Sequence, residues 1–182
     1  MEFQINSFLK GDQASPSITQ LNDGGFVVTW SSHMVNDYLG GSGRDIVGKR
    51  FDQDGIAVGQ EFRINTTTQL FNGINDQGYP SVTSLESGGF VVVWTSDEQD
   101  GNGEGIFGQV FNADVELEGT EFQVNTYTEN HQASPSVASF KDGGFIVTWQ
   151  SIGPDGDDHG VFGQRFDATG NPVSAQTVYP FV

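Results

Sequence analysis

One heptapeptide occurs three times along the chain of 182 residues, and this repeat constrains the fold more than any other feature of the sequence. The copies read Gly-Gly-Phe-Val-Val-Thr-Trp at 24–30, Gly-Gly-Phe-Val-Val-Val-Trp at 88–94 and Gly-Gly-Phe-Ile-Val-Thr-Trp at 143–149. Each copy follows a Pro-Ser pair and precedes an aliphatic-x-Gly-x-x-Phe segment. The spacing of about 60 residues predicts a single repeat domain with three units, at residues 7–66, 67–126 and 127–182.

Four short segments in each unit have the pattern of β-strands. They are rich in Val, Ile, Phe and Trp, they alternate with a period of two, and Gly, Asp, Asn or Pro bounds them. Four antiparallel strands with one Trp per unit are typical of a β-propeller blade. We therefore predict an all-β, β-propeller-like fold of three four-stranded antiparallel repeats. The repeats would form either a three-bladed ring within one chain or half of a six-bladed ring completed by a homodimer.

The chain also begins with a partial copy of the repeat. Glu2-Phe3-Gln4-Ile5-Asn6 matches the Glu-Phe-x-aliphatic-Asn sequence found at 61–65 and 121–125, where the first two units end. We expect residues 1–6 to be an extra leading strand. Such a strand could complete the last blade, in this chain or in a partner, and so remove an exposed sheet edge.

The repeated segments resemble those of a known class of proteins. The repeated segments have the consensus Gly-Gly-Phe-Val-Val-Thr-Trp, then Gly-Ile-Phe-Gly-Gln-Arg-Phe-Asp, of which 105–111 is one copy, then Glu-Phe-Gln-Val-Asn-Thr as at 121–126. They are similar to the tandem repeats of large secreted bacterial proteins of the RTX-like adhesin type. The resemblance covers nearly the whole chain. It implies an extracellular or cell-surface module in a setting where calcium is abundant.

Acidic loops between the second and third segments of the units are candidate calcium sites. Ca²⁺ takes six to eight oxygen ligands, and glycine lets a loop fold around the ion. The predicted ligands are Asp97, Asp100, Asn102 and Glu104 in the second unit and Asp155, Asp157 and Asp158 in the third. The alternative, that these Asp-Gly and Asn-Gly sequences only make solvated turns, stays open.

Other repeated residues favour structural roles. Trp30, Trp94 and Trp149 end the most apolar segment and are expected in the core, although exposed Trp rings could stack on sugars. A glutamine three residues before each repeated proline is expected to hydrogen-bond the loop backbone. The acidic and amide residues after the third segment, Asp52, Asn112 and Asp167, are expected to form turns.

Charge and composition exclude several functions. With 7 basic and 24 acidic residues the net charge is −17, which disfavours nucleic acid and anionic membranes as partners. The absence of cysteine excludes disulfides and thiolate chemistry. No hydrophobic run approaches the ~20 residues that span a bilayer.

Catalytic motifs are also missing from the sequence. The three histidines show no metal-ligand spacing, and no Gly-x-Ser-x-Gly sequence is present. We therefore expect a noncatalytic binding or adhesion module that is stabilised by calcium and recognises a glycan or another cell-surface ligand. A structural or self-assembling unit and a carbohydrate-active enzyme are the alternatives.

Overall fold

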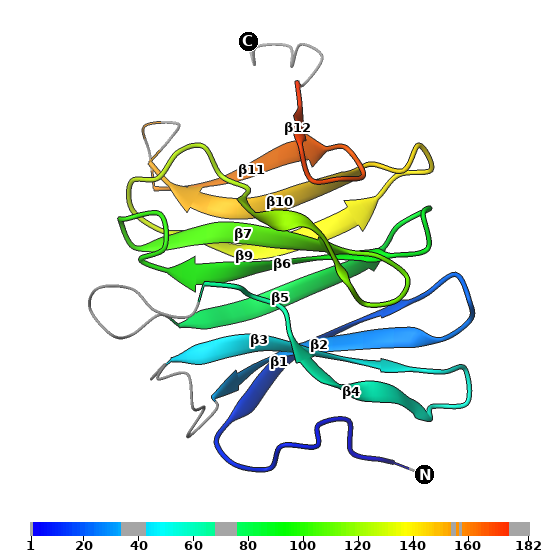
Figure 1. Cartoon of the computed structure of the whole chain (residues 1–182). Helices are drawn as coiled ribbons and strands as arrows, with labels where there is room; N and C mark the ends of the chain where they lie inside the picture. Colours follow the sequence, from blue (N-terminus) through cyan, green and yellow to red (C-terminus); the bar gives the residue numbers. More distant parts are fainter. Residues whose placement is uncertain (1, 34–42, 68–75, 154–155, 157, 175–182) are drawn as a thin grey trace.

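The computed structural model describes residues 2–33, 43–67, 76–153, 156 and 158–174, and the regular structure in these residues consists of β-strands (Figure 1). Sheet 1 contains β1 (Gln13–Gln20), β2 (Phe26–His33), β3 (Arg44–Phe51) and β4 (Ala57–Arg63). Sheet 2 contains β5 (Gln77–Ser84), β6 (Phe90–Asp97), β7 (Glu104–Phe111) and β8 (Leu117–Gln123). Sheet 3 contains β9 (Gln132–Ser139), β10 (Phe145–Ile152), β11 (His159–Phe166) and the short β12 (Pro172–Val173). The predicted four-stranded antiparallel repeats are confirmed.

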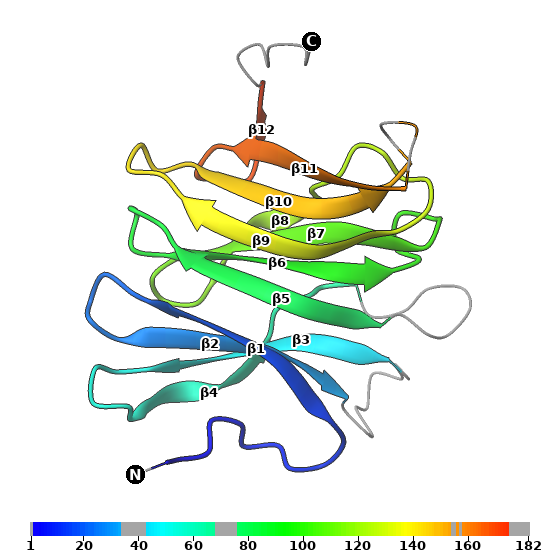
Figure 2. The same cartoon turned by 180° about the vertical axis from the view of Figure 1, so that it is seen from behind.

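The three sheets stand in a row, with sheet 2 between sheets 1 and 3 (Figures 1 and 2). Their first strands are neighbours, since β5 contacts both β1 and β9. This is the arrangement of adjacent propeller blades. The three-bladed ring, one of the two expected arrangements, is wrong for the described residues because sheets 1 and 3 lie at opposite ends of the row. In a closed ring of three, sheets 1 and 3 would also pack on each other, whereas in the described residues each of them packs on sheet 2.

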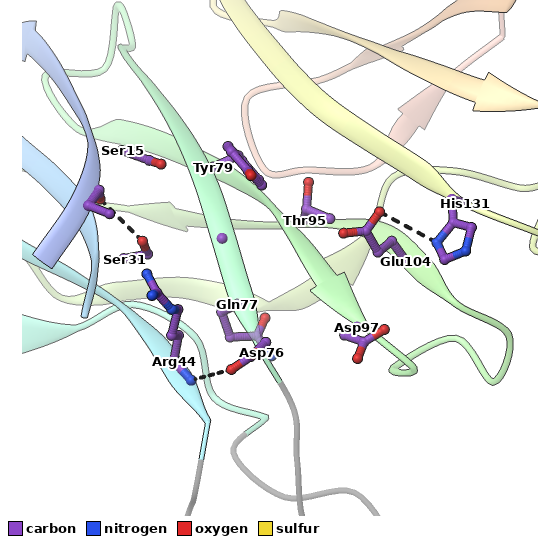
Figure 3. Close-up of a pocket in the computed structure, with 12 residues that line it drawn as sticks. Ser15, Ser31, Arg44, Asp76, Gln77, Tyr79, Thr95, Asp97, Glu104 and His131 are labelled. Carbon is purple, nitrogen blue, oxygen red and sulfur yellow. Dashed lines mark hydrogen bonds and ion pairs between the residues drawn. The ribbon is translucent and has the colours of Figure 1, made fainter. Parts of the chain in front are cut away.

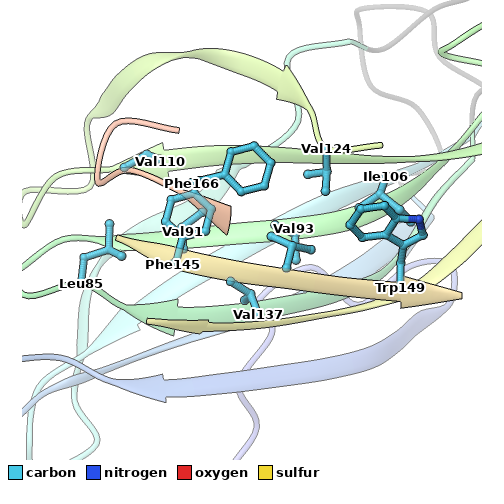
Figure 4. Close-up of a cluster of buried hydrophobic side chains, with 11 residues drawn as sticks. Leu85, Val91, Val93, Ile106, Val110, Val124, Val137, Phe145, Trp149 and Phe166 are labelled. Carbon is cyan, nitrogen blue, oxygen red and sulfur yellow. The ribbon is translucent and has the colours of Figure 1, made fainter. Parts of the chain in front are cut away.

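Hydrophobic cores fill the two spaces between the sheets. Val91 and Val93 of β6 face sheet 3, while Phe90, Val92 and Trp94 of the same strand face sheet 1. Figure 4 shows the core between sheets 2 and 3, where side chains from both sheets meet. Burying one large aliphatic or aromatic side chain contributes about 1.5–3 kcal/mol. The middle sheet is therefore held on both faces.

Each sheet carries a stacked pair of Phe rings from its second and third strands. The pairs are Phe26/Phe51, Phe90/Phe111 and Phe145/Phe166, with ring centroids 5.0, 4.9 and 5.2 Å apart.

A Phe ring from the fourth strand of one sheet covers the pair of the next sheet. Phe62 of β4 contacts the pair in sheet 2, and Phe122 of β8 contacts the pair in sheet 3. Each ring crosses a glycine of its own sheet. A Cβ atom at Gly48 would lie 2.7 Å from the Phe62 ring, and one at Gly108 would lie 2.7 Å from the Phe122 ring. The repeated glycine therefore leaves the space that the Phe ring fills, and we call this position the glycine seat.

Residues 2–6 differ from the expected leading strand. They form no strand, because their described contacts are made through side chains on sheet 1 rather than through a β-ladder. Phe3 packs edge-on against Phe51, and Lys49 Nζ donates a hydrogen bond to the Ile5 carbonyl at 3.0 Å. The segment is thus fixed to sheet 1 without extending it.

The structural roles expected for the repeated Trp and turn residues are confirmed. All three Trp side chains are buried. Asp52, Asn112 and Asp167 each accept hydrogen bonds from backbone N–H groups two and four residues later. These side chains close the turns between the third and fourth strands.

The repeated glutamines also bond to the loop backbone as expected, where the bonds are described. Gln13 Nε2 donates to the Lys10 carbonyl at 3.1 Å, and Gln132 Nε2 donates to the Glu129 carbonyl at 2.9 Å. In the part of the chain that the structure describes, no helix is long and apolar enough to cross a membrane.

Candidate functional site

A pocket of about 530 Å³ opens where the first strands of the sheets meet, around the beginning of β5 (Figure 3). Its volume lies within the usual range of ~300–1,000 Å³ for small-molecule sites. Residues from all three units line it: Ala14, Ser15, Ser31, Arg44, Asp76, Gln77, Gly78, Tyr79, Thr95, Asp97, Glu104 and His131. The pocket is therefore built by the packing of the sheets and not by one loop.

Two residues that line the pocket, Ser15 and Tyr79, have an unusual backbone conformation. Ser15, Tyr79 and Ser134 hold equivalent places before the repeated prolines, and their φ angles are 53°, 52° and 56°. Non-glycine residues adopt positive φ only at a cost of about 1–3 kcal/mol. In β1 and β5 the strand register shifts at this place, which is the mark of a β-bulge. The bulge turns the side chain toward solvent.

Of these three residues, Tyr79 alone is aromatic, and it is 59% exposed. It borders the main pocket and also a shallower hollow of about 310 Å³ that runs along the Pro-Ser segments of all three sheets. Its ring is therefore available to a ligand lying across the first strands.

Charged groups of both signs surround the pocket. The backbone N–H of Arg44 donates to Asp76 Oδ1 at 2.9 Å, and the Arg44 guanidinium pairs with Asp12 at 3.4 Å. Across the pocket, His131 Nδ1 lies 3.5 Å from Glu104 Oε2. These contacts fix the acids at the ends of neighbouring strands.

Asp97 is the acid whose ionisation the pocket disfavours. Burial raises its pKa above the ordinary value of 3.8, and the negative charges of Glu98 and Asp76 raise it further, while His131 acts in the opposite direction. Asp97 and Glu104 are directly paired across the β6–β7 ladder. Their carboxyl groups therefore belong to one wall of the pocket.

The predicted calcium ligands of the second unit fall into two groups. Asp97 and Glu104 line the pocket, whereas Asp100 accepts hydrogen bonds from Asn102 N at 3.3 Å and from Asn125 Nδ2 at 3.3 Å. Amide donors thus occupy the Asp100 carboxylate. Among the described residues, no three His, Asp or Glu side chains are close enough together to hold a metal ion.

The predicted ligands of the third unit are only partly described. Asp155 and Asp157 lie outside the described residues, and Asp158 is exposed just before β11. The calcium site in that loop stays a prediction.

Sequence reasoning missed Tyr79, Asp76 and Arg44 as site residues. The available signal was departure from the repeat: Tyr79 stands where the other units have Ser15 and Ser134. Several pocket residues, among them Tyr79, Arg44 and Asp97, differ from their counterparts in the other units, although the repeated Gln77 also lines the pocket.

No protein-family model and no curated protein sequence matches the chain. Among solved structures, the Hadza microbial sialidase Hz136 superposes with a TM-score of 0.61 at 14% identity, over 89% of this chain and 38% of that chain. An alpha-L-arabinofuranosidase from Lactobacillus brevis gives 0.59 at 11% identity, over 97% of this chain and 59% of that chain. An endo-arabinase from Bacteroides thetaiotaomicron gives 0.52 at 15% identity, over 90% and 57%.

The chain spans less than two thirds of the length of each of these structures. At such low identities the likeness shows the fold alone. It supports the propeller-like arrangement of the three sheets that the strand order and packing already display.

Proposed function

We propose that the protein is a noncatalytic, extracellular or cell-surface carbohydrate-binding module whose glycan-binding site is the pocket beside Tyr79. The observation that carries this proposal is one exposed aromatic ring set among hydroxyl, carboxylate and guanidinium groups. Sugars offer apolar C–H faces that pack on aromatic rings and hydroxyl groups that pair with polar side chains. The three similar structures, a sialidase, an endo-arabinase and an alpha-L-arabinofuranosidase, agree with this ligand class.

The position of the acids supports binding over catalysis. Glycosidases generally place two carboxyl groups on either side of the scissile bond. Here Asp97 and Glu104 stand side by side on adjacent strands, and the Asp97 backbone N–H donates to the Asp76 carbonyl at 3.0 Å. The three acids are therefore neighbours at one end of sheet 2, a layout suited to accepting hydrogen bonds from several hydroxyl groups.

A glycan array followed by calorimetry with the best glycan tests the proposal. Replacing Tyr79 with Ser gives the residue that the other two units hold at this bulge, so the fold should be kept. We expect Tyr79→Ser to weaken binding about tenfold, or ~1.4 kcal/mol, and Tyr79→Phe to retain it. Ile56→Ala, at an exposed turn remote from the pocket lining, is the control. Equal affinity in Tyr79→Ser and wild type, or no glycan binding at all, would sink the proposal.

A second candidate function is glycoside hydrolysis, which the raised pKa of Asp97 favours because a general acid must hold its proton near working pH. A screen with chromogenic glycosides separates the two functions. Turnover that Asp97→Asn abolishes would establish an enzyme, and binding without turnover would support the noncatalytic module.

A further inference from the structure

The two interfaces inside the chain follow one pattern, which gives a template for a third. In both, the fourth strand of one sheet carries a Phe ring onto the stacked pair of the next, at 5.7 Å for Phe62 to Phe111 and 5.3 Å for Phe122 to Phe166. In both, a serine hydroxyl of the first strand accepts a hydrogen bond from the next first strand. Val82 N donates to Ser17 Oγ at 3.2 Å, and Val137 N donates to Ser81 Oγ at 3.3 Å.

Residues 2–7 occupy on sheet 1 the place that a preceding sheet would fill. Phe3 contacts Phe51 with ring centroids 6.1 Å apart, as Phe62 and Phe122 contact the equivalent rings of sheets 2 and 3. The Ser7 backbone N–H donates to the Glu61 carboxylate, just as the Thr66 backbone N–H donates to Glu121. The segment therefore lies on sheet 1 in the way that the fourth strand of a preceding sheet would.

Within the described residues, sheet 3 has the complementary deficit at its own outer edge. Its β11 pairs with β12 only at Arg165 and Phe166, whereas β3 and β7 also pair at their repeated glycines. Gly163 is the third copy of the glycine seat, and no described aromatic ring lies within 4 Å of a Cβ built there. At the place of Phe62 and Phe122 the sequence of the third unit has Thr177, which lies outside the described residues.

Exposed aliphatic side chains mark both ends of the row. Val161 on sheet 3 is 84% exposed, while its counterparts Ile46 and Ile106 are 0% exposed within the internal interfaces. At the other end, Ile18 on sheet 1 is 63% exposed, while its counterparts Val82 and Val137 are 7% and 9% exposed. Each end thus presents the apolar surface that the other end would cover.

An arginine gives the docking a direction. Arg50 of sheet 1 pairs with Asp23 and extends Nη1 to the Ala113 carbonyl of sheet 2 at 2.9 Å. Arg165 of sheet 3 holds the equivalent position and pairs with Asp142 in the same way. At the interface between sheets 1 and 2 this arginine reaches the next sheet, whereas sheet 2 has Val110 at the equivalent place. For Arg165 of sheet 3, the next sheet would be sheet 1 of another copy.

We propose that the chain associates head to tail with a second copy of itself, sheet 3 of one copy docking on sheet 1 of the other. Residues 2–6 of the second copy become the fourth strand beside β11, with Phe3 seated over Gly163. A single chain cannot make this contact in the observed arrangement, because the two ends face away from each other along the row (Figure 1).

Gly163→Ala tests the proposal without disturbing the chain's own packing. Among the described residues of one chain, the new Cβ would meet its nearest atoms, Thr148 Cγ2 and the Val147 carbonyl, at 3.4 Å. It would block the ring of Phe3, as a Cβ at Gly48 would meet Phe62 at 2.7 Å. In sedimentation velocity between about 1 and about 100 µM, we expect wild type to associate and Gly163→Ala and Phe3→Ala to dissociate at least tenfold more readily. Leu9→Ala, at an exposed residue outside the described contacts of the seat, is the control.

Mixing the two variants supplies a readout that a merely structural defect would not give. The Phe3→Ala copy keeps an intact glycine seat, and the Gly163→Ala copy keeps an intact Phe3, so one sound interface can form between them. We expect the mixture to associate more strongly than either variant alone. A monomeric wild type, or association that neither substitution weakens, would overturn the proposal.

Discussion

Equivalent residues in the three units take different roles although their backbones match. Ser15, Tyr79 and Ser134 share one backbone conformation, yet only the side chain of Tyr79 is aromatic. The glycine at 48, 108 and 163 is the same in each unit, and at Gly48 and Gly108 it leaves space for a Phe ring. The effect of a substitution therefore depends on the contacts that the residue makes in its own unit.

Gly48→Ala should destabilise the chain by about 1–3 kcal/mol, the usual cost of overpacking. Its Cβ would lie 2.7 Å from the Phe62 ring and 3.1 Å from Ile64 Cδ1. Gly78→Ala is the matched control, since no atom lies within 4 Å of a Cβ there and the equivalent residues are Ala14 and Ala133. Urea denaturation of both variants checks the difference, and equal stabilities would contradict the ring-seat role.

Asp167 should stabilise the fold above its unfolded pKa. Burial acts against its ionisation, but hydrogen bonds from Asn171 and Thr169 outweigh that effect and lower the pKa from 3.8 to about 2. Because the folded pKa is lowered, the stabilisation is present near neutral pH and is lost as the pH falls from about 4 to about 2. Asp167→Ala should cost ~1 kcal/mol at pH 7 and progressively less in that acid range.

Asp167→Asn separates charge from turn geometry, because Asn112 closes the same turn in sheet 2. It should keep most of the stability at pH 7 and show none of this residue's pH dependence. Denaturation curves recorded at several pH values check both variants; a pH-independent Asp167→Ala effect would contradict the assignment.

Asp97 should have the opposite effect on stability. Its pKa is raised in the folded chain, so its ionisation disfavours folding and stability falls as the pH rises through the folded pKa. Asp97→Asn should therefore be more stable than wild type at pH 7, with the gain disappearing below about pH 3.8. Thermal unfolding at pH 3 and pH 7 measures this, and a variant less stable than wild type at pH 7 would refute it.

At the scale of strands and loops, period-two alternation predicted the strands well because the middle sheet buries both faces and the outer strands bury one. The short β12 and the unpaired residues 2–6 were not predictable, since strand formation depends on a neighbouring edge and not on local sequence. The pocket was not predictable either. Tyr79 and Glu104 are far apart along the chain and become neighbours of one cavity only through sheet packing.

Calcium binding by the 97–104 loop stays a prediction, and it requires Asp100 to leave its amide partners. If the ion binds with the ~0.1–1 mM affinity common in extracellular modules, 5 mM Ca²⁺ should raise the unfolding temperature relative to chelator, by mass action. Asp100→Ala should abolish the rise, while Asp114→Ala, at a turn after β7, should not. Equal unfolding temperatures with Ca²⁺ and chelator would exclude the site.

At the scale of the whole molecule, the sequence predicted three units and their order. It left open whether they form a three-bladed ring or half of a six-bladed ring, because the angle between sheets depends on how facing side chains pack. The row of sheets leaves two unlike ends, one with Ile18 and one with Val161. Since Tyr79 is the one aromatic residue at the three bulges, each copy would carry one glycan-binding site. Association of copies would bring several of these sites to one ligand.

Sheet 2 is covered on both faces, and this has a consequence for the order in which backbone amides open to solvent. Every residue of β6 except the last is buried, whereas burial alternates along β11. Local opening should therefore begin at sheet 3 and reach β6 only in global unfolding. Deuterium uptake followed by mass spectrometry should be slowest in residues 90–96 and faster in 159–166, and the difference should shrink at concentrations where a second copy covers sheet 3.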